Sequence, residues 1–412
     1  MGDAETDRRL TADESLTGRW RRIGSGHTVE LDAVTLWMTE LPLVRPIATA
    51  KGIHRRRPLV FVQVSGRSRG RAVEGWGECA ALGDAGYDRE DDSVASEALE
   101  RTIVPALFEQ VAGDAHRLPP PSALGPVRQF ASGTPLAFAA LEMAVADAHL
   151  RAEGRSMAEL LGVDRRTVEL GAVAGLAPSP AGLVERIGEL VEAGFARVKV
   201  KVAPGTDVGD LEAVRISWPG LRLQADANGS YGAGDDDYLR GLDRFDLLCL
   251  EQPFDRMDLA AHARLAVRMR TPICLDESFG SPADVVAALA MGACSVVCVK
   301  PARLGGLGAA LQVIESCAAA GVPLWMGGMF ESGYARAVNT TLGALAGFAW
   351  PGDLSPAATY LRDDVVPGPR LSRCGSAGAL AASLPPGPGM GPAPEAHALA
   401  RHPGRRVVME AS

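Results

Sequence analysis

The chain has 412 residues, of which 47% are hydrophobic and 5% aromatic, and its formal net charge is −8. This length exceeds one ordinary domain, and the hydrophobic share argues against a mainly disordered chain. The acidic balance disfavours a nucleic-acid partner.

The sequence favours a cytoplasmic protein without a membrane partner. Met1 to Leu10 is charged and has no apolar core, so we expect no signal peptide. No apolar run reaches the roughly 18 residues that a membrane span needs. The seven cysteines are odd in number and lack CxxC spacing, which predicts buried free thiols in a reducing compartment.

The first 150 residues indicate a polar extension followed by an α+β domain over 28–150. Residues 1–27 are polar, and we expect them to be loose. Apolar periodicity predicts antiparallel strands over 29–38, 58–64 and 75–79, and helices over 93–111, 135–152 and 156–161. In the second helix we expect Glu142 and Asp147 to be exposed or paired.

A loop is predicted over residues 41–57. It holds Pro46, Gly52 and three consecutive arginines, Arg55 to Arg57. The arginines favour either a solvated arm or a lid that offers cations to an anionic substrate.

Residues 151–366 show a repeat that predicts a barrel. Short apolar runs close on Lys201, Asp226, Glu251, Asp276 and Lys300, at steps of 25, 25, 25 and 24 residues. A strand, a helix and two loops take that length, so the fold class is α/β, a (β/α) barrel behind the α+β domain. The eight predicted strands are 168–174, 197–202, 221–228, 247–251, 273–276, 295–300, 322–327 and 342–349.

The last segment, residues 367–412, is rich in Pro, Gly and Ala. The run from Leu384 to Pro392 holds four prolines and three glycines. This composition disfavours regular elements, and we expect the segment to pack on the first domain or to stay loose.

The carboxylates Asp226, Glu251 and Asp276 indicate a metal site. Barrel strands end at one common face, so three acids from separate strands converge there and repel one another unless a cation lies between them. Oxygen ligands without histidine or cysteine suit Mg²⁺, with Mn²⁺ as a substitute, and disfavour zinc. The alternative, pairing of each acid with an arginine, does not explain the equal spacing.

Lysine is rare in this chain and is concentrated at predicted strand ends. Of the 42 residues that are Lys or Arg, four are lysines: Lys51, Lys199, Lys201 and Lys300. Unlike arginine, lysine loses its proton when its pKa is lowered, and we expect the neighbouring charges and burial to lower it here. Paired lysines beside a metal indicate removal of a proton α to a carboxylate. A Schiff-base aldolase, the competing use of a barrel lysine, does not need three carboxylates.

These runs together resemble the enolase superfamily, in the o-succinylbenzoate synthase / N-acylamino acid racemase branch of its muconate-lactonising subgroup. The resemblance covers about residues 28–365. The runs that carry it are Lys199-Val-Lys201, Asp226-Ala-Asn228, Leu250-Glu-Gln-Pro253, Leu275-Asp-Glu-Ser278, Val299-Lys-Pro-Ala-Arg-Leu-Gly-Gly306, Gly327-Gly-Met-Phe-Glu-Ser-Gly333 and Pro351-Gly-Asp-Leu-Ser-Pro356.

The resemblance implies a role for each motif residue. The three acids would hold magnesium, Lys201 and Lys300 would be the acid and base, and Lys199 would support Lys201. The first domain would cap the barrel, with loop 41–57 closing over a small carboxylate substrate. The substrate-binding residues would be Asn228, Arg303, Gly327, Gly328, Met329, Glu331 and Lys51.

The resemblance implies o-succinylbenzoate synthase activity, N-acylamino acid racemase activity, or both. Separately, we expect a cytoplasmic homo-oligomer. Arg303 resembles an arginine of members that racemise N-succinylamino acids. Gly352-Asp353-Leu354-Ser355 lacks the Asp-x-Asp of dipeptide epimerases. The alternatives are a cycloisomerase or epimerase acting on another carboxylate, and a catalytically inactive barrel that binds an anion.

Overall fold

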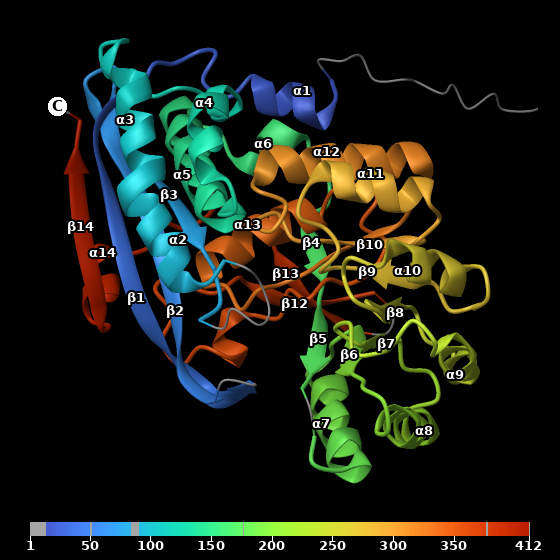
Figure 1. The fold of residues 1–412 in the computed structure, drawn as a ribbon. Helices are drawn as coiled ribbons and strands as arrows, with labels where there is room; N and C mark the ends of the chain where they lie inside the picture. Colours follow the sequence, from blue (N-terminus) through green and yellow to red (C-terminus); the bar gives the residue numbers. More distant parts are fainter. Residues whose placement is uncertain (1–13, 50–51, 84–89, 176, 376–377, 412) are drawn as a thin grey trace, which may run out of the picture.

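The computed structural model describes residues 14–49, 52–83, 90–175, 177–375 and 378–411. Figure 1 shows an antiparallel sheet with its helices beside a ring of parallel strands with theirs. Lys51, a predicted substrate-binding residue, lies outside the described residues.

The antiparallel sheet has the strand order β14-β1-β2-β3. Its strands are β1 (Glu30–Thr49), β2 (Gly52–Ser68), β3 (Arg71–Cys79) and β14 (Gly404–Glu410). The predicted loop over 41–57 is wrong, because β1 and β2 continue through most of it as a paired hairpin. A register shift between Pro42 and Ile47 lets the ladder pass Pro46, which has no N–H to donate.

The helices of this region pack against the sheet and against one another. They are α2 (Asp92–Ala98), which continues through a π-helical turn (Leu99–Ile103) into α3 (Val104–Ala112), then α4 (Gly125–Arg128), α5 (Pro135–Glu153) and α6 (Met157–Leu161), with 3₁₀ turns at Pro121–Ala123 and Gln129–Ala131.

Helix α5 lies between the sheet and the barrel (Figure 1). It approaches β3 so closely that a Cβ on Gly77 would lie 1.9 Å from the Ala140 carbonyl oxygen. Only glycine therefore fits at this position. The helix is buried on all sides from Leu136 to Leu150, including Glu142. Asp147, also buried, is ion-paired with Arg151, as the prediction of a paired acid allowed.

The extension expected to be loose is docked over its described part. Helix α1 (Leu16–Arg21) buries Trp20, and Ile23 behind it is also buried. The amide and the hydroxyl of Thr17 both donate to Glu315 of the barrel helix α12 (Leu307–Ala320). The expectation of a loose segment is therefore wrong for residues 14–27, because apolar side chains within the polar run anchor it.

The barrel sheet contains seven parallel strands in the order β11-β10-β9-β8-β7-β6-β5. They are β5 (Gly171–Ala174), β6 (Arg197–Lys201), β7 (Leu223–Asp226), β8 (Leu250–Glu251), β9 (Ile273–Leu275), β10 (Val296–Val299) and β11 (Leu324–Met326). The helices between and after them are α7 (Pro180–Ala193), α8 (Asp207–Ser217), α9 (Asp236–Arg240) with a 3₁₀ turn at Gly241–Phe245, α10 (Leu259–Ala266), α11 (Pro282–Ala290), α12 (Leu307–Ala320) and α13 (Gly333–Gly343). This arrangement confirms the predicted fold class.

The eighth predicted strand, 342–349, is reduced to isolated contacts. Its first residues end α13, and Gly347 adopts a φ of +97°, which a strand cannot continue through. Single parallel bridges then join Phe348 to Leu324 and Gly352 to Leu170. Residues 347–352 thereby link the two edges of the sheet, so the ring closes without a full strand.

The C-terminal segment joins both regions. Strands β12 (Leu371–Cys374) and β13 (Ala379–Ser383) form a small sheet with β4 (Thr167–Glu169), and β14 pairs with β1 of the first sheet. Helix α14 (Ala396–Ala400) precedes β14, and a 3₁₀ turn lies at Ala357–Thr359. Regular elements therefore form here despite the high content of Pro and Gly.

All seven cysteines are free, as predicted, and six of them are buried. In the described ranges, no helix combines the length and the apolar character that crossing a membrane requires.

Candidate active site

The parallel register brings the predicted acids and lysines to one edge of the barrel. Lys201 is paired with Asp226 on the next strand, and Asp226 with Glu251 on the one after. Each of these three residues ends its strand, so they form a row across β6, β7 and β8. Asp276 and Lys300 directly follow β9 and β10 and extend the row.

Lys199 lies at the centre of a cluster of acids. Its Nζ is 3.1 Å from Asp226 Oδ2, 3.1 Å from Glu251 Oε2 and 3.0 Å from Asp353 Oδ2. Burial lowers the pKa of Lys199, but Asp353, Glu251 and Asp226 outweigh burial and hold the pKa well above its ordinary value. The expected lowering of the lysine pKa is therefore wrong for Lys199, which is a fixed positive charge.

Lys201 and Lys300 each donate to a different acid. Lys201 Nζ is 2.7 Å from Asp226 Oδ2 and 2.5 Å from Asn228 Oδ1, and its side chain is 30% exposed. Lys300 Nζ is 2.6 Å from Asp276 Oδ2 and is buried. The more exposed lysine and the buried one therefore reach opposite ends of the row of acids.

Arg303 binds the same acid as Lys300. Its Nη1 lies 2.5 Å from Asp276 Oδ1. Burial raises the pKa of Asp276, but Arg303 and Lys300 lower it more and keep this acid ionised. Pairing with an arginine, the alternative weighed for the three acids, thus occurs at Asp276 together with the lysine contact.

Two of the three acids, Glu251 and Asp276, lie in a group that fits a divalent cation, whereas Asp226 is outside this group and binds Lys199 and Lys201. Glu251, Asp276 and Cys298 each offer one ligand atom, and these atoms lie within 4.8 Å of one another. Burial, with Asp226 beside it, raises the pKa of Glu251 to about 8, which reports the crowding of negative charge that a cation relieves. The expectation that no cysteine accompanies the acids is wrong, because Cys298 belongs to this group, although burial raises its thiol pKa well above its ordinary value. The two carboxylates suit a hard cation.

The segment after β11 packs directly against Lys300. A Cβ on Gly327 would lie 2.7 Å from Lys300 Cε, and one on Gly328 would lie 2.8 Å from the Asp353 carbonyl oxygen. Glycine at both positions therefore makes room for the site.

Met329 and Glu331 are buried in the same segment. Glu331 Oε2 is 2.8 Å from Arg336, and its Oε1 accepts from Asn339 at 3.0 Å. The carboxylate of Glu331 thus has protein partners, which compete with its predicted role as a substrate contact.

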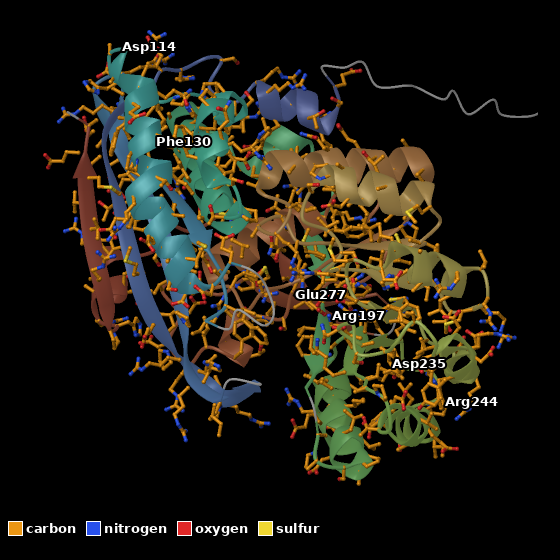
Figure 2. The ribbon with its side chains drawn as sticks, in the orientation of Figure 1. Asp114, Phe130, Arg197, Asp235, Arg244 and Glu277 are labelled. Carbon is orange, nitrogen blue, oxygen red and sulfur yellow. The ribbon has the colours of Figure 1, made fainter. Side chains whose placement is uncertain are left out.

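Asp353 and Gln252 belong to the site but were not among the predicted residues. Asp353 binds Lys199 and also accepts from Arg197 at 2.7 Å. Figure 2 labels Arg197, which is fully buried in the barrel. Gln252 Oε1 accepts from the amide of Asp276 at 3.1 Å. Both lie in the quoted motifs, but only their three-dimensional contacts reveal these roles.

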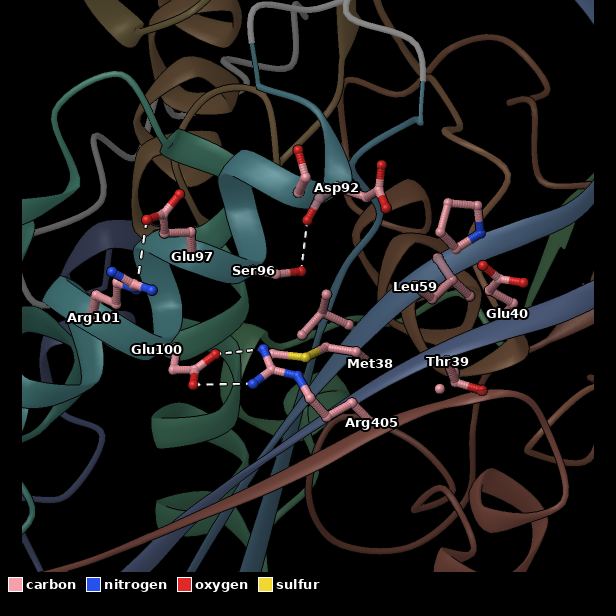
Figure 3. Close-up of a pocket in the computed structure, with 14 residues that line it drawn as sticks. Met38, Thr39, Glu40, Leu59, Asp92, Ser96, Glu97, Glu100, Arg101 and Arg405 are labelled. Atoms are coloured by element: carbon pink, nitrogen blue, oxygen red, sulfur yellow. Dashed lines mark hydrogen bonds and ion pairs between the residues drawn. The ribbon is translucent and has the colours of Figure 1, made fainter. Parts of the chain in front are cut away.

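A separate groove of about 520 Å³ lies on the first domain (Figure 3). It is lined by β1, β2, α2 and β14, and the ion pair between Glu100 and Arg405 crosses it. Among the described residues, no predicted site residue lines this groove, so it is distinct from the cluster of acids and lysines.

Comparison with known proteins identifies the family. Residues 33–162 match the profile of the mandelate racemase / muconate lactonizing enzyme N-terminal domain, and residues 182–398 match the enolase C-terminal domain-like profile. The chain belongs to the enolase superfamily.

Two individual relatives and one solved structure show which members of the superfamily are similar to this chain. The chain is 38% identical to an N-succinylamino acid racemase of an Amycolatopsis species, over 89% of this chain and 95% of that protein. It is 36% identical to an o-succinylbenzoate synthase of Geobacillus stearothermophilus, over 82% and 88% respectively. A solved enolase-superfamily structure from Listeria innocua superposes with a TM-score of 0.85 at 31% identity, covering 93% of this chain and 100% of the other.

Proposed function

We propose that this chain is an enzyme that removes the proton α to a carboxylate, as an N-succinylamino acid racemase, an o-succinylbenzoate synthase, or both. The observation that carries the proposal is the row of Lys201, Asp226, Glu251, Asp276 and Lys300 along neighbouring strand ends. The names of the relatives, in both classes, support the same reaction types.

In this proposal Asp226, Glu251 and Asp276 hold Mg²⁺, or Mn²⁺ in its place. A bound divalent cation would stabilise the negative charge that develops on the substrate carboxylate. Lys199 remains charged beside Asp226 and Glu251, and its charge favours the ionised form of both acids. It therefore serves as a permanent cation of the site and not as a proton acceptor.

Lys201 and Lys300 move the proton. Strands β7, β8 and β9 separate β6 from β10, so the two amines approach the acids from different sides. For racemisation, one lysine takes the α-proton from one face and the other returns a proton to the opposite face. For dehydration, one lysine acts first as base and then as acid toward the leaving hydroxyl, while the other stabilises charge.

Arg303, Asn228 and residues 327–331 contact the substrate in this proposal. Arg303 supports an anionic acyl group, because a guanidinium binds carboxylates strongly, and this role competes with its contact to Asp276. In this proposal the hairpin of β1 and β2 covers the site, and Lys51, outside the described residues, stays a predicted substrate contact.

Proton NMR in deuterated water tests the proposal. The protein with magnesium is incubated with N-succinyl-L-phenylalanine and, separately, with the cyclohexadiene precursor of o-succinylbenzoate. Loss of the α-proton signal with formation of the D-isomer identifies a racemase, and aromatisation of the precursor identifies a synthase. Absence of both reactions in a metal-loaded protein would refute both named activities.

We further propose that the protein is a cytoplasmic homo-oligomer. The seven free thiols suit a reducing compartment, and the edge strand β14 offers a surface for pairing. Light scattering after size exclusion would contradict the oligomer if it returned the mass of one chain.

A further inference from the structure

Two buried carboxylates of the first region bind the starts of two barrel helices. Glu142 of α5 accepts from the amide of Leu307 at 2.6 Å and from that of Gly308 at 3.3 Å. Glu78 of β3 accepts from the amide of Ser332 at 2.8 Å and from its hydroxyl at 2.5 Å. Both acids thus complement the positive end of a helix dipole in the other region of the molecule.

Each of these helices begins where a loop of the candidate site ends. Helix α12 starts at Leu307, four residues after Arg303 and seven after Lys300. Helix α13 starts at Gly333, two residues after Glu331. A shift of either helix start would therefore move the residues proposed to act on the substrate.

The backbone around Glu142 is shaped to admit it. A Cβ on Gly306 would lie 2.2 Å from Glu142 Oε2, and one on Gly308 would lie 2.9 Å from Trp20 Nε1. Gly306 also has a φ of +123°, which favours glycine. The loop that carries Lys300 and Arg303 is thus built around the carboxylate.

Arg57 provides a third polar contact between the first region and the barrel. Its guanidinium is fully buried and donates to the carbonyl oxygens of Met329 at 3.1 Å and Phe330 at 3.2 Å. It also donates to those of Ala80 and Ala81, at 2.5 Å and 2.6 Å, within the first region. Arg57 therefore ties the segment after β11 to the end of β3.

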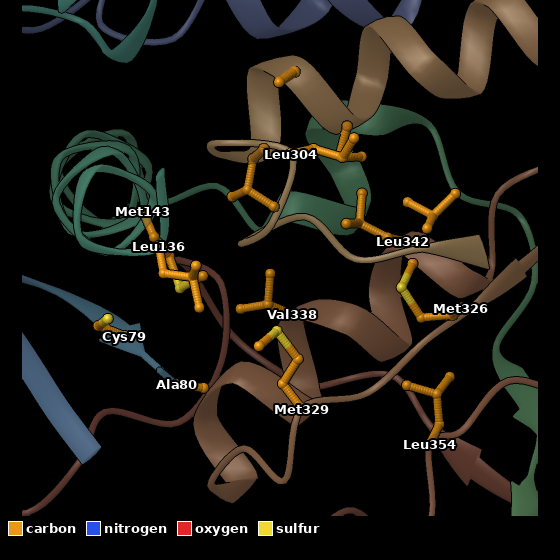
Figure 4. Close-up of a cluster of buried hydrophobic side chains, with 14 of the residues drawn as sticks. Cys79, Ala80, Leu136, Met143, Leu304, Met326, Met329, Val338, Leu342 and Leu354 are labelled. Atoms are coloured by element: carbon orange, nitrogen blue, oxygen red, sulfur yellow. The ribbon is translucent and has the colours of Figure 1, made fainter. Parts of the chain in front are cut away.

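Apolar packing surrounds these polar contacts. Figure 4 shows Leu136 and Met143 of α5, with Cys79 at the end of β3 and Ala80 after it, beside Leu304, Met329 and Val338 of the barrel. Burial raises the pKa of both Glu78 and Glu142 to about 7. A charged carboxylate in an apolar, buried environment is stable only when donors such as these amides bind it. These contacts therefore fix the position of the first region relative to the barrel.

We propose that Glu142, Glu78 and Arg57 are positioning residues that set the two barrel loops, 300–306 and 327–331, from the first domain. The inference rests on the proposed function in that these loops hold the groups that act on the substrate. The contacts themselves do not depend on the substrate's identity. The first domain would thus align Lys300 as well as cover the pocket.

The test compares Glu142→Gln and Glu78→Gln with Glu90→Gln in the full chain loaded with magnesium. Glu90 is a matched control, because its carboxylate binds the amides of Leu136 and Ala137 at 2.7 Å and 2.8 Å within the first region. Hydrogen–deuterium exchange is measured in peptides covering 300–310 and 327–337, together with kcat and KM for N-succinyl-L-phenylalanine.

We expect Glu142→Gln to raise exchange at 300–310 and to lower kcat about 10-fold, the lower end of what loss of a buried charged hydrogen bond costs. We expect Glu78→Gln to raise exchange at 327–337 and to raise KM. Glu90→Gln should leave both peptides and both constants unchanged. Equal effects of all three variants, or unchanged exchange in the first two, would overturn the proposal.

A wild-type protein that does not turn over the substrate would refute the racemase while leaving the exchange comparison intact. If Glu142→Gln does not fold, Glu142→Asp, which keeps the charge and shortens its reach, gives the same comparison.

Discussion

The strand ends of the barrel and the loops that follow them are held in different ways. Lys201, Asp226 and Glu251 lie in a row because parallel pairing fixes their register within one sheet. Met329 is instead bound by Arg57, about 270 residues away along the chain. The proposed chemistry therefore depends on local sheet geometry, whereas the shape of the pocket depends on how the two domains meet.

Removal of the metal should have the largest effect, because the acids and lysines at the barrel strand ends all act around it in the proposed reaction. We expect a chelator to abolish turnover of the active substrate and added Mg²⁺ to restore it, since three carboxylates cannot stabilise a developing negative charge on their own. The measurement is the rate of α-proton exchange by NMR. Undiminished exchange in excess chelator would disprove a metal-dependent site.

Replacement of Lys201 or Lys300, the lysines at the two ends of the row of acids, should have the next largest effect. Lys201→Arg and Lys300→Arg keep a positive charge but cannot release a proton at working pH, so we expect each to lower racemisation about 10³-fold, within the range typical of general acid–base catalysis. Chiral chromatography of the product provides the rate. Near-native racemisation by either variant would refute the two-base assignment.

The Asp353→Asn substitution tests a residue shared by the strand ends and the loops. It removes the buried charge that pairs with Arg197 and Lys199, so we expect a loss of about 3–5 kcal/mol in the free energy of unfolding. Urea denaturation measures it. Asp363→Asn is the control, because Asp363 is 49% exposed and its loss should cost less than about 0.5 kcal/mol.

The same ion pairs give this stabilisation a pH dependence. Burial raises the pKa of Asp353, but Lys199 and Arg197 lower it more, to well below its ordinary value. The stabilisation is therefore fully present above the unfolded-state pKa of about 3.9 and is lost as the pH falls toward the folded-state value. The difference between wild type and Asp353→Asn should shrink in acid, and a constant difference would contradict this cause.

Gly327→Ala should have a smaller effect on kcat, because it displaces one lysine, Lys300. The added Cβ would lie 2.6 Å from Cys298 Sγ and 2.7 Å from Lys300 Cε, so the lysine must shift. Because small misplacements of a reacting group cost up to about 100-fold, we expect kcat to fall about 10-fold to 100-fold. Gly234→Ala, where a Cβ meets nothing within 4 Å, should leave kcat unchanged.

The residues at the strand ends could be predicted from the sequence, because polar residues follow short apolar runs there at a regular spacing. Equal spacing of Asp226, Glu251 and Asp276 required only parallel strands of similar length. The hairpin over 41–57 was predicted as a loop, because the pairing of β1 with β2, which passes Pro46 by a register shift, cannot be read from a segment with Pro46 and Gly52. The raised pKa of Lys199 was also missed, because Asp353 reaches it from a loop far along the chain.

The smallest expected effect concerns Ile53, which is 68% exposed in the hairpin. If the hairpin covers the substrate, Ile53 adds apolar contact, and burying part of one aliphatic side chain amounts to about 1 kcal/mol or less. We therefore expect Ile53→Ser to raise KM for N-succinyl-L-phenylalanine about 2-fold to 5-fold. Val408→Ser on β14, where Val408 is 45% exposed, is the matched control and should leave KM unchanged. A KM that responds equally to both substitutions would indicate a general surface effect and would separate the hairpin from the pocket.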